Sequence, residues 1–185
     1  MGNKIRLVVL LLVIVFCSLT LSAWAQNSTK GAEFTAQDIQ YSYKKNVTTF
    51  WGSPEKPVSV QVGQLTIWAP HLEYYQETGL VVASGGVRLE GTDPVMTLTC
   101  QQIEATEKQV IATGDVTFDY QDFTGTAARL TYLPPKEWVS LEGDPVIQTE
   151  NGRISGERIE IDLVKEVVTA TGGSKLYLEE VVENQ

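Results

Sequence analysis

The chain has 185 residues, of which 43% are hydrophobic and 20% charged, with 14 Lys and Arg against 23 Asp and Glu. This composition predicts a folded chain of one domain, or two small ones, rather than a disordered one. The formal net charge of −9 argues against nucleic acid as a partner, because phosphate binding relies on clustered Lys and Arg. One His and two distant Cys provide almost no material for a metal site or a thiol redox pair.

The N-terminus has the build of a secretory signal peptide. Two basic residues precede an apolar run that ends at Ala23-Trp24-Ala25, so we predict a cleavable signal peptide over residues 1–25 and an exported chain that begins at Gln26. The alternative is an uncleaved membrane anchor. The apolar run from Leu7 to Leu21 has 15 residues, however, and roughly 20 are needed to span a bilayer.

Removal of the signal peptide changes the charge and the cysteine content. The exported chain holds 12 Lys and Arg against 23 Asp and Glu, a net charge of −11, and one cysteine, Cys100. A single cysteine forms no internal disulfide, so stability must come from the core and from sheet hydrogen bonds. We expect Cys100 to be a small buried apolar residue.

Four short segments of the chain resemble one another at a constant spacing. Each contains a glycine in a Gly-Gly or Gly-Asp pair, and successive glycines are 29 residues apart: Gly85, Gly114, Gly143 and Gly172. A small residue followed three positions later by an aliphatic one precedes each glycine: Ala69 with Leu72, Cys100 with Ile103, Ala127 with Leu130, and Gly156 with Ile159. The repeats predict a domain over 58–178, preceded by a segment 26–57 with the first strands and followed by a tail 179–185.

The aliphatic residue of each unit lies 13 positions before its glycine in three units and 11 positions before it in the second, where we expect a shorter turn. Apolar and polar residues alternate within the units, as at Val116, Phe118 and Tyr120, which is the pattern of a half-buried strand. Only Ala36 to Lys44 has a helical period. Four such units predict an all-β protein, an elongated antiparallel sheet folded over on itself around one apolar inner face.

These repeats, behind a signal peptide, resemble the LptA/OstA-like family of periplasmic lipopolysaccharide transport proteins. The matching stretches fall between 58 and 178: Trp68 to Val87, Cys100 to Val116, Ala127 to Val146, and Gly156 to Leu176. The stretch Phe34 to Pro57 matches the family's first strand poorly. The resemblance implies an OstA-like β-jellyroll whose apolar interior holds lipid acyl chains, while the sugar and phosphate groups stay outside.

The resemblance also implies how such a protein would act and with which partners. Copies would join edge to edge as a head-to-tail homo-oligomer, between LptC-like inner-membrane and LptD-like outer-membrane proteins, and so bridge the periplasm for lipopolysaccharide or a related glycolipid. An acidic protein gains little from contact with an anionic headgroup. Burial of acyl chains, at roughly 0.8 kcal/mol per CH₂, would therefore have to provide the affinity.

The alternating pattern predicts thirteen inner-face residues that line the lipid or pack the core. They are Val60, Leu65, Ile67, Leu72, Val87, Leu89, Met96, Leu98, Ile103, Val116, Phe118, Leu130 and Ile159. The pattern alone favours core packing. The resemblance makes lipid contact an equal alternative for those near an open side, without indicating which residues these are.

No residue pattern indicates catalysis, a cofactor or a metal. His71 is the only histidine, and no recognisable motif places a nucleophile beside it. Asp115, Asp119 and Asp122 suggest calcium only weakly, because the first two belong to an alternating strand and are expected on a solvated face.

Two alternative functions remain open from the sequence. The first is an LptC-like subunit of the same pathway that an uncleaved segment holds in the inner membrane. The second is a secreted β-repeat module that binds carbohydrate or protein through its outer face and has a dry, closely packed interior.

Overall fold

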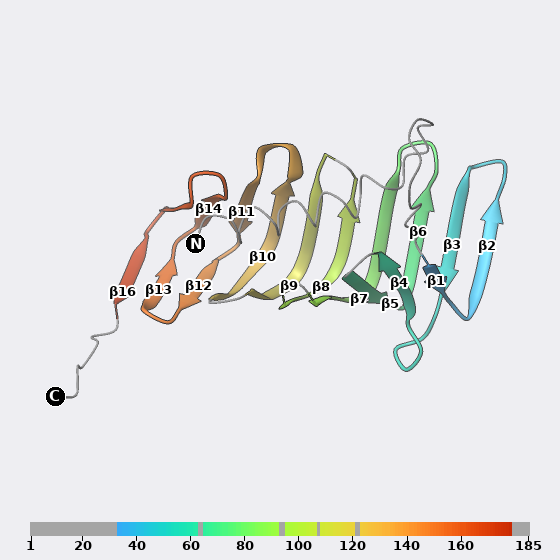
Figure 1. The fold of residues 1–185 in the computed structure, drawn as a ribbon, viewed down its shortest axis with the longest axis horizontal. Helices are drawn as coiled ribbons and strands as arrows, with labels where there is room; N and C mark the ends of the chain where they lie inside the picture. Colours follow the sequence, from blue (N-terminus) through green and yellow to red (C-terminus); the bar gives the residue numbers. More distant parts are fainter. Residues whose placement is uncertain (1–32, 63–64, 93–94, 107, 121–122, 179–185) are drawn as a thin grey trace.

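The computed structural model describes residues 33–62, 65–92, 95–106, 108–120 and 123–178. These residues form sixteen antiparallel strands of one continuous sheet, with a single 3₁₀ turn, η1, at Pro134–Lys136. Figure 1 shows the strands side by side along the long axis of the molecule, from β2 at one end to β16 at the other. The predicted all-β class and elongated jellyroll are confirmed. The predicted signal peptide and the tail 179–185 lie outside the described residues.

Strand lengths divide the sheet into a central part and two flanks. The strands are β1 (Glu33–Thr35), β2 (Asp38–Ser42), β3 (Val47–Trp51), β4 (Val58–Val62), β5 (Leu65–Ala69), β6 (His71–Tyr75), β7 (Leu80–Thr92), β8 (Val95–Ala105), β9 (Val110–Tyr120), β10 (Phe123–Leu133), β11 (Trp138–Glu142), β12 (Val146–Thr149), β13 (Gly152–Ser155), β14 (Arg158–Asp162), β15 (Val167–Thr171) and β16 (Lys175–Leu178). The central strands β7 to β10 have 11 to 13 residues each, whereas the flanking strands have three to five.

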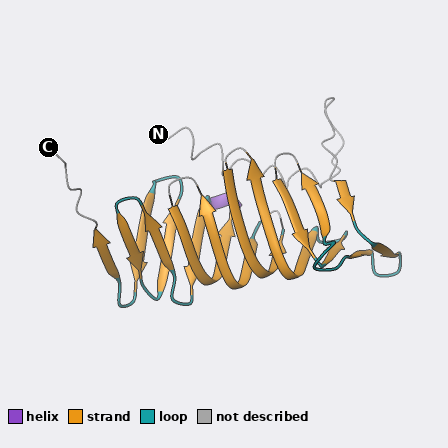
Figure 2. Ribbon diagram, turned by 90° about the horizontal axis from the view of Figure 1, so that it is seen from below, coloured by secondary structure: helices purple, strands orange, loops and turns teal. Residues whose placement is uncertain are grey.

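The sheet folds over into two layers. The first layer runs β2-β3-β6-β7-β8-β9-β10-β11-β14-β15, and the second runs β1-β4-β5-β7-β8-β9-β10-β12-β13-β16. The strands β7 to β10 belong to both layers because each of them bends midway, and the pairing register shifts there, for example between Ser84 and Val87. Figure 2 shows these strands curving from one layer into the other.

The bends lie along one side of the molecule, which we call the spine. The repeated glycines Gly85, Gly114, Gly143 and Gly172 lie there with φ between 74° and 91°, and the residue after each glycine also has a positive φ. Glycine adopts this conformation freely and Asp tolerates it, which explains the Gly-Gly and Gly-Asp pairs. Close packing adds a second requirement. A Cβ on Gly143 would lie 2.4 Å from the Cβ of Ala128, on the neighbouring bend.

At the other side of each layer, which we call the hairpin side, strands turn back within the same layer. One repeat unit therefore contributes two strand segments to each layer. The shorter spacing of the second unit has a cause that we did not predict. The first-layer connection 106–109 has as many residues as the turn 76–79 of the first predicted unit, but within the first layer β8 and β9 form four residue pairs, whereas β6 and β7 form five. The paired segment is shorter, and the turn is not.

The segment 36–69 forms a fifth unit, which precedes the four predicted ones. Ala36 and Ile39 repeat the small-x-x-aliphatic motif, and Gly52 follows Ile39 by 13 residues. The loop 53–57 then breaks the 29-residue spacing. The helical period of Ala36 to Lys44 was misleading, because β2 occupies this stretch. An end strand buries little of either face, so its period of two is weak.

The core lies between the layers and follows the register of the sheet. Residues of both layers, such as Leu72 of the first and Val87 of the second, meet in one buried cluster, and a second cluster surrounds Leu141 and Ile159. Facing residues form a row across the first layer: Phe50, Leu72, Ala83, Ile103, Ala112, Leu130, Leu141, Ile159 and Ala170. The aliphatic residue of each predicted unit belongs to this row, so the repeat motif specifies one line of the core.

Candidate lipid-binding interior and strand edges

The structure brings the predicted inner-face residues together in the interior. Seven are buried, with at most 7% of their surface exposed: Val60, Leu72, Val87, Leu89, Ile103, Val116 and Ile159. Five are half-buried and pack against the buried clusters: Ile67, Met96, Leu98, Phe118 and Leu130. Leu65 lies in β5, and its side chain is outside the described part. Whether any of them contacts lipid stays a prediction.

Burial decreases away from the spine in the second layer. Val87 and Val116 follow the spine glycines directly and are 2% and 1% exposed. Leu98 and Phe118 pair with each other one step further along their strands and are half-buried, as is Met96 another step away. The second layer is therefore tightly packed at the spine and looser toward the hairpin side.

Sequence reasoning missed several interior residues. Leu141 is fully buried, and Ile147 and Phe50 are also in the core. Leu141 could have been found from its alternation with Ser140 and Glu142 before Gly143. Phe50 belongs to the fifth unit, 36–69, which the sequence did not reveal. Its ring stacks on that of Phe34 with centroids 4.7 Å apart.

Two titratable groups lie in the interior. Burial raises the pKa of the Cys100 thiol to about 11, and this side chain is 4% exposed, as expected for a small core residue. Tyr132 is also 4% exposed, and its hydroxyl has no hydrogen-bond partner among the described residues. Burial, and to a lesser extent the charge of Glu137, raises the pKa of Tyr132. Both groups therefore remain protonated at neutral pH.

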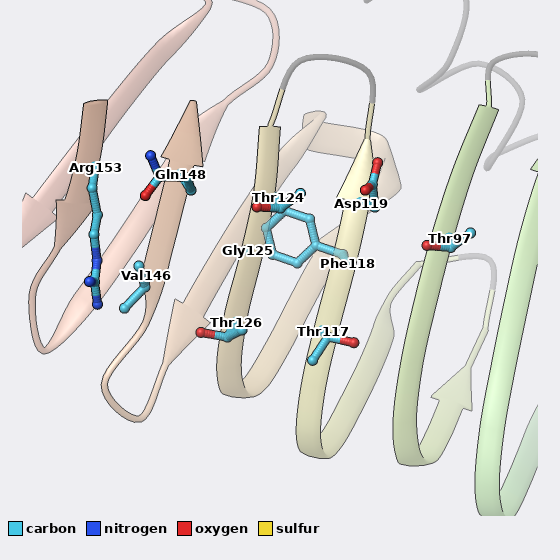
Figure 3. A pocket seen from close by; sticks show the side chains of 10 residues that line it. All are labelled: Thr97, Thr117, Phe118, Asp119, Thr124, Gly125, Thr126, Val146, Gln148 and Arg153. Carbon is cyan, nitrogen blue, oxygen red and sulfur yellow. The ribbon is translucent and has the colours of Figure 1, made fainter. Parts of the chain in front are cut away.

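The outer face of the second layer has a polar hollow, of about 480 Å³. Figure 3 shows the side chains that line it, from β8 to β13. Four threonines, Thr97, Thr117, Thr124 and Thr126, share this hollow with Asp119, Gln148 and Arg153, and Phe118, Gly125 and Val146 also line it. One carboxylate, one guanidinium and several hydroxyls offer contacts to a polar ligand. Asp119 is exposed here, as predicted for a solvated face.

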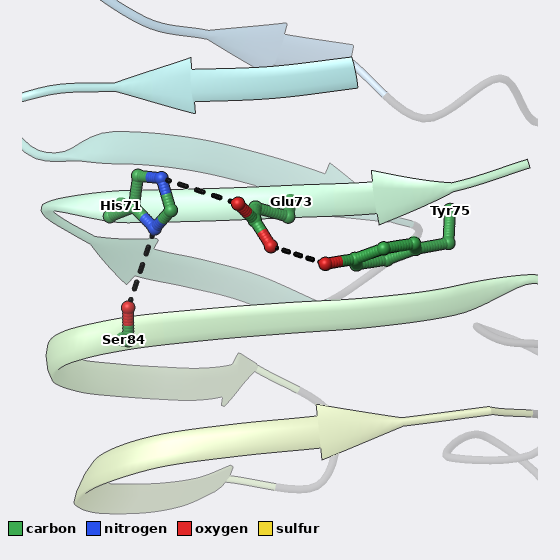
Figure 4. A network of polar contacts seen from close by, with 4 residues as sticks. All are labelled: His71, Glu73, Tyr75 and Ser84. Atoms are coloured by element: carbon green, nitrogen blue, oxygen red, sulfur yellow. Dashed lines mark hydrogen bonds and ion pairs between the residues drawn. The ribbon is translucent and has the colours of Figure 1, made fainter. Parts of the chain in front are cut away.

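His71 belongs to a polar network on the outer face of the first layer (Figure 4). Its Nδ1 lies 3.5 Å from Ser84 Oγ, and its Nε2 lies 3.9 Å from Glu73 Oε1. Both distances are longer than the 2.6–3.2 Å of a well-formed pair of nucleophile and base. The Tyr75 hydroxyl donates to Glu73 Oε2 at 2.6 Å, which raises the pKa of Tyr75. The network joins β6 to β7 across an exposed surface.

The described ranges contain no group of three or more His, Cys, Asp and Glu side chains that could hold a metal ion. Asp115 lies on the spine, apart from Asp119 in the hollow, and Asp122 is outside the described residues. No helix of this part of the chain is long and apolar enough to cross a bilayer.

Both layers end in strands whose outer edge has no partner strand within the described part of the chain. The end strands are β1 and β2 at one end, and β15 and β16 at the other. Most of the exposed large apolar side chains lie on these strands or next to them. They are Ile39, Tyr41, Tyr43, Val164, Val167, Val168, Leu176, Tyr177 and Leu178. An unpaired strand edge with apolar side chains recruits another strand.

The fold and these features define a class of protein: a two-layered β-jellyroll with an apolar interior and unpaired strands at both ends. The chain belongs to the family of LPS transport proteins that comprises LptA and the N-terminal domain of LptD, whose model matches residues 33–167. The predicted resemblance is thus confirmed. Because the match begins at residue 33, it includes the stretch Phe34 to Pro57, which we expected to match the family poorly.

Several solved structures also match this chain. A crystal structure of LptH from Pseudomonas aeruginosa, described as the LptA-homologous periplasmic component of the lipopolysaccharide transport device, is 15% identical. The match covers 82% of this chain and 96% of that chain with a TM-score of 0.38. The sequence matches none of the curated proteins.

Proposed function

We propose that the protein is a periplasmic carrier that binds lipopolysaccharide through its acyl chains and bridges the inner and outer membranes by edge-to-edge assembly. The observation that carries this proposal is the combination of an apolar interior with end strands whose outer edges are unpaired, three of which, β2, β15 and β16, carry exposed apolar side chains. Membership of a lipopolysaccharide transport family supports the choice of ligand. LptC-like and LptD-like proteins would be its partners at the two membranes.

The acyl chains would enter between the layers from the hairpin side. Only the spine joins the layers through bent strands in the described part of the chain, so they can separate at the opposite side without breaking a strand. The half-buried residues Met96, Leu98 and Phe118 would meet the lipid first. Each CH₂ that leaves water contributes about 0.8 kcal/mol, so a few chains suffice for tight binding without headgroup contacts.

The strand directions favour head-to-tail assembly. Each layer has ten strand segments, and all neighbours are antiparallel, so the first and last strands of a layer run in opposite directions. A second copy placed end to end in the same orientation would therefore continue the antiparallel alternation in both layers. Its β2 would meet β15, and its β1 would meet β16. The two interiors would then be continuous.

Photocrosslinking in cells tests the lipid-binding part of this proposal. A photoreactive residue at Leu98 or Phe118 should capture lipopolysaccharide, and the same residue at Glu104, which is exposed on the outer face, should not. Capture at Glu104 alone would show that the interior is not the binding site.

Charged substitutions at the ends test the assembly. Ile39→Lys on β2 and Leu176→Lys on β16 should each lower the concentration-dependent mass measured by sedimentation velocity. Val95→Lys is the matched control, because Val95 is also an exposed apolar residue, 72% accessible, but lies on the internal strand β8. Equal effects of all three substitutions would reject assembly through the end strands.

A second candidate function rests on the polar hollow of Figure 3. An outer-face carbohydrate-binding module would use its threonines, Asp119 and Arg153, and would need no opening of the interior. Titration with a lipid-free core oligosaccharide distinguishes the two functions. Saturable binding that Arg153→Ala abolishes, together with no retention of lipid, would favour the module. For the anchored LptC-like alternative, the mass of the mature protein decides whether residues 1–25 are removed.

A further inference from the structure

Tyr132 places a hydroxyl group in the apolar interior without a partner. It lies on the inner face of β10, between Val110 of β9 and Val139 of β11 in the register of the first layer. The side chain is 4% exposed, and its oxygen has no hydrogen-bond partner among the described residues. Buried hydroxyls nearly always make a hydrogen bond, because an unmade one is costly in apolar surroundings. The missing partner points to a group that the protein alone does not supply.

The chemistry of Tyr132 restricts what this partner can be. Since its pKa is raised, the phenol stays protonated and offers one O–H donor. Its cross-strand partners Val110 and Val139 are apolar, and the charge of Glu137 also acts on the phenol. A partner between the layers would carry an acceptor oxygen on an otherwise apolar body, as an acyl chain does at its ester or hydroxyl groups.

The position of Tyr132 fits the polar end of such a chain. Tyr132 lies two residues before η1, which is on the hairpin side, and therefore about 7 Å inside the rim of the first layer. A chain that enters from this side with its headgroup outside has its ester and hydroxyl oxygens near the headgroup. These oxygens would reach the depth of Tyr132, whereas the hydrocarbon end would lie closer to the spine.

We propose that the Tyr132 hydroxyl donates a hydrogen bond to an ester or hydroxyl oxygen at the head end of a bound acyl chain, and so selects oxygenated lipid over plain hydrocarbon. This inference rests on the proposed function, because it requires acyl chains in the interior. Tyr132 is then a specificity-determining residue whose hydroxyl gains an acceptor oxygen when lipid is loaded.

Ser140 also has a buried hydroxyl oxygen with no partner among the described residues, but it does not belong to the same site. It lies on the outer face of β11, between Trp138 and Glu142 along the strand. Arg158 spans these two residues, with its guanidinium 5.7 Å from the Trp138 ring centroid and its Nη1 3.4 Å from Glu142. Ser140 is thus buried within an outer-face cluster, and Tyr132 remains the interior donor.

The test compares two probes on three proteins: the wild type, Tyr132→Phe, and Tyr75→Phe as the matched control on the outer face. The probes are purified lipopolysaccharide, which carries oxygenated chains, and diphenylhexatriene, a fluorescent hydrocarbon without an acceptor. Tyr132→Phe should bind lipopolysaccharide about 3- to 10-fold more weakly, the range expected for one neutral hydrogen bond. Its affinity for diphenylhexatriene should not change, and Tyr75→Phe should bind both probes like the wild type.

Thermal unfolding of the lipid-free proteins separates this role from a structural one. Because the substitution removes an unpaired hydroxyl, Tyr132→Phe should unfold at the same temperature as the wild type or at a higher one. A lower unfolding temperature, or unchanged binding of lipopolysaccharide, would overturn the assignment of Tyr132 and leave the proposed function intact. Failure of the wild type to bind either probe would overturn both.

Discussion

The contact between Gly143 and Ala128 predicts a large effect of a one-carbon substitution at the spine. In Gly143→Ala the new Cβ would lie 2.4 Å from the Cβ of Ala128, and both atoms are attached directly to the backbone. Relief of such an overlap costs about 1–3 kcal/mol. The φ of 79° adds about 1–2 kcal/mol for a residue with a Cβ. We expect the free energy of unfolding to fall by about 2–5 kcal/mol in total.

Two further variants separate these causes. Gly79 also has a positive φ, 66°, but a Cβ there would meet no atom within 4 Å, so Gly79→Ala should lose only the conformational part. The double variant Gly143→Ala/Ala128→Gly removes the atom that Gly143→Ala would contact, and should regain most of the packing loss. Urea unfolding followed by tryptophan fluorescence measures all three variants. Equal losses for Gly143→Ala and Gly79→Ala would refute close packing of the spine.

Two other predictions concern the core. Leu141→Ala should lower the free energy of unfolding by about 2–5 kcal/mol, because Leu141 is fully buried. Leu176→Ala is the control: Leu176 is 64% exposed, so this variant should change the free energy of unfolding by less than about 0.5 kcal/mol. Comparable losses in the two variants would place Leu141 outside the core. The pKa of Cys100 rises from its ordinary value near 9 to about 11, so the folded state holds a proton that the unfolded state releases, and stability should be lost as the pH rises from 9 to 11. Cys100→Ala should weaken this loss in urea melts at pH 8 and pH 10.5, and an identical pH dependence would contradict it.

The repeat was predictable because the spine imposes two requirements on one residue. A positive φ and a close neighbouring bend both select glycine, so the four glycines stand out in the sequence at a constant interval. The aliphatic residue after each bend marks the buried row of the first layer. Spacing and alternation together were therefore sufficient to predict an all-β structure folded over on itself.

The fifth unit, 36–69, was not predicted because each of these signals is weak there. Gly52 has no positive φ, although a Cβ on it would lie 2.5 Å from the Lys56 carbonyl oxygen. The loop 53–57 shifts the spacing to the next glycine. Ile39 occupies the aliphatic position of the motif but is 60% exposed, since β2 ends its layer. An end strand is under less selection for alternation, and the unit is recognisable only once the register is known.

The depth of each residue in the interior could not be predicted, and depth is what the proposed function depends on. A period of two tells which face of a strand a residue occupies, but not how far it lies from the bend. Val116 and Phe118 are equivalent by pattern, yet Val116 is 1% exposed beside the spine and Phe118 is half-buried. Because the layers are joined at the spine, a lipid that separates them would displace contacts of Phe118 long before those of Val116. In the second layer the inner face therefore has a gradient of burial, and under the proposed function its half-buried part toward the hairpin side is the part that exchanges with lipid.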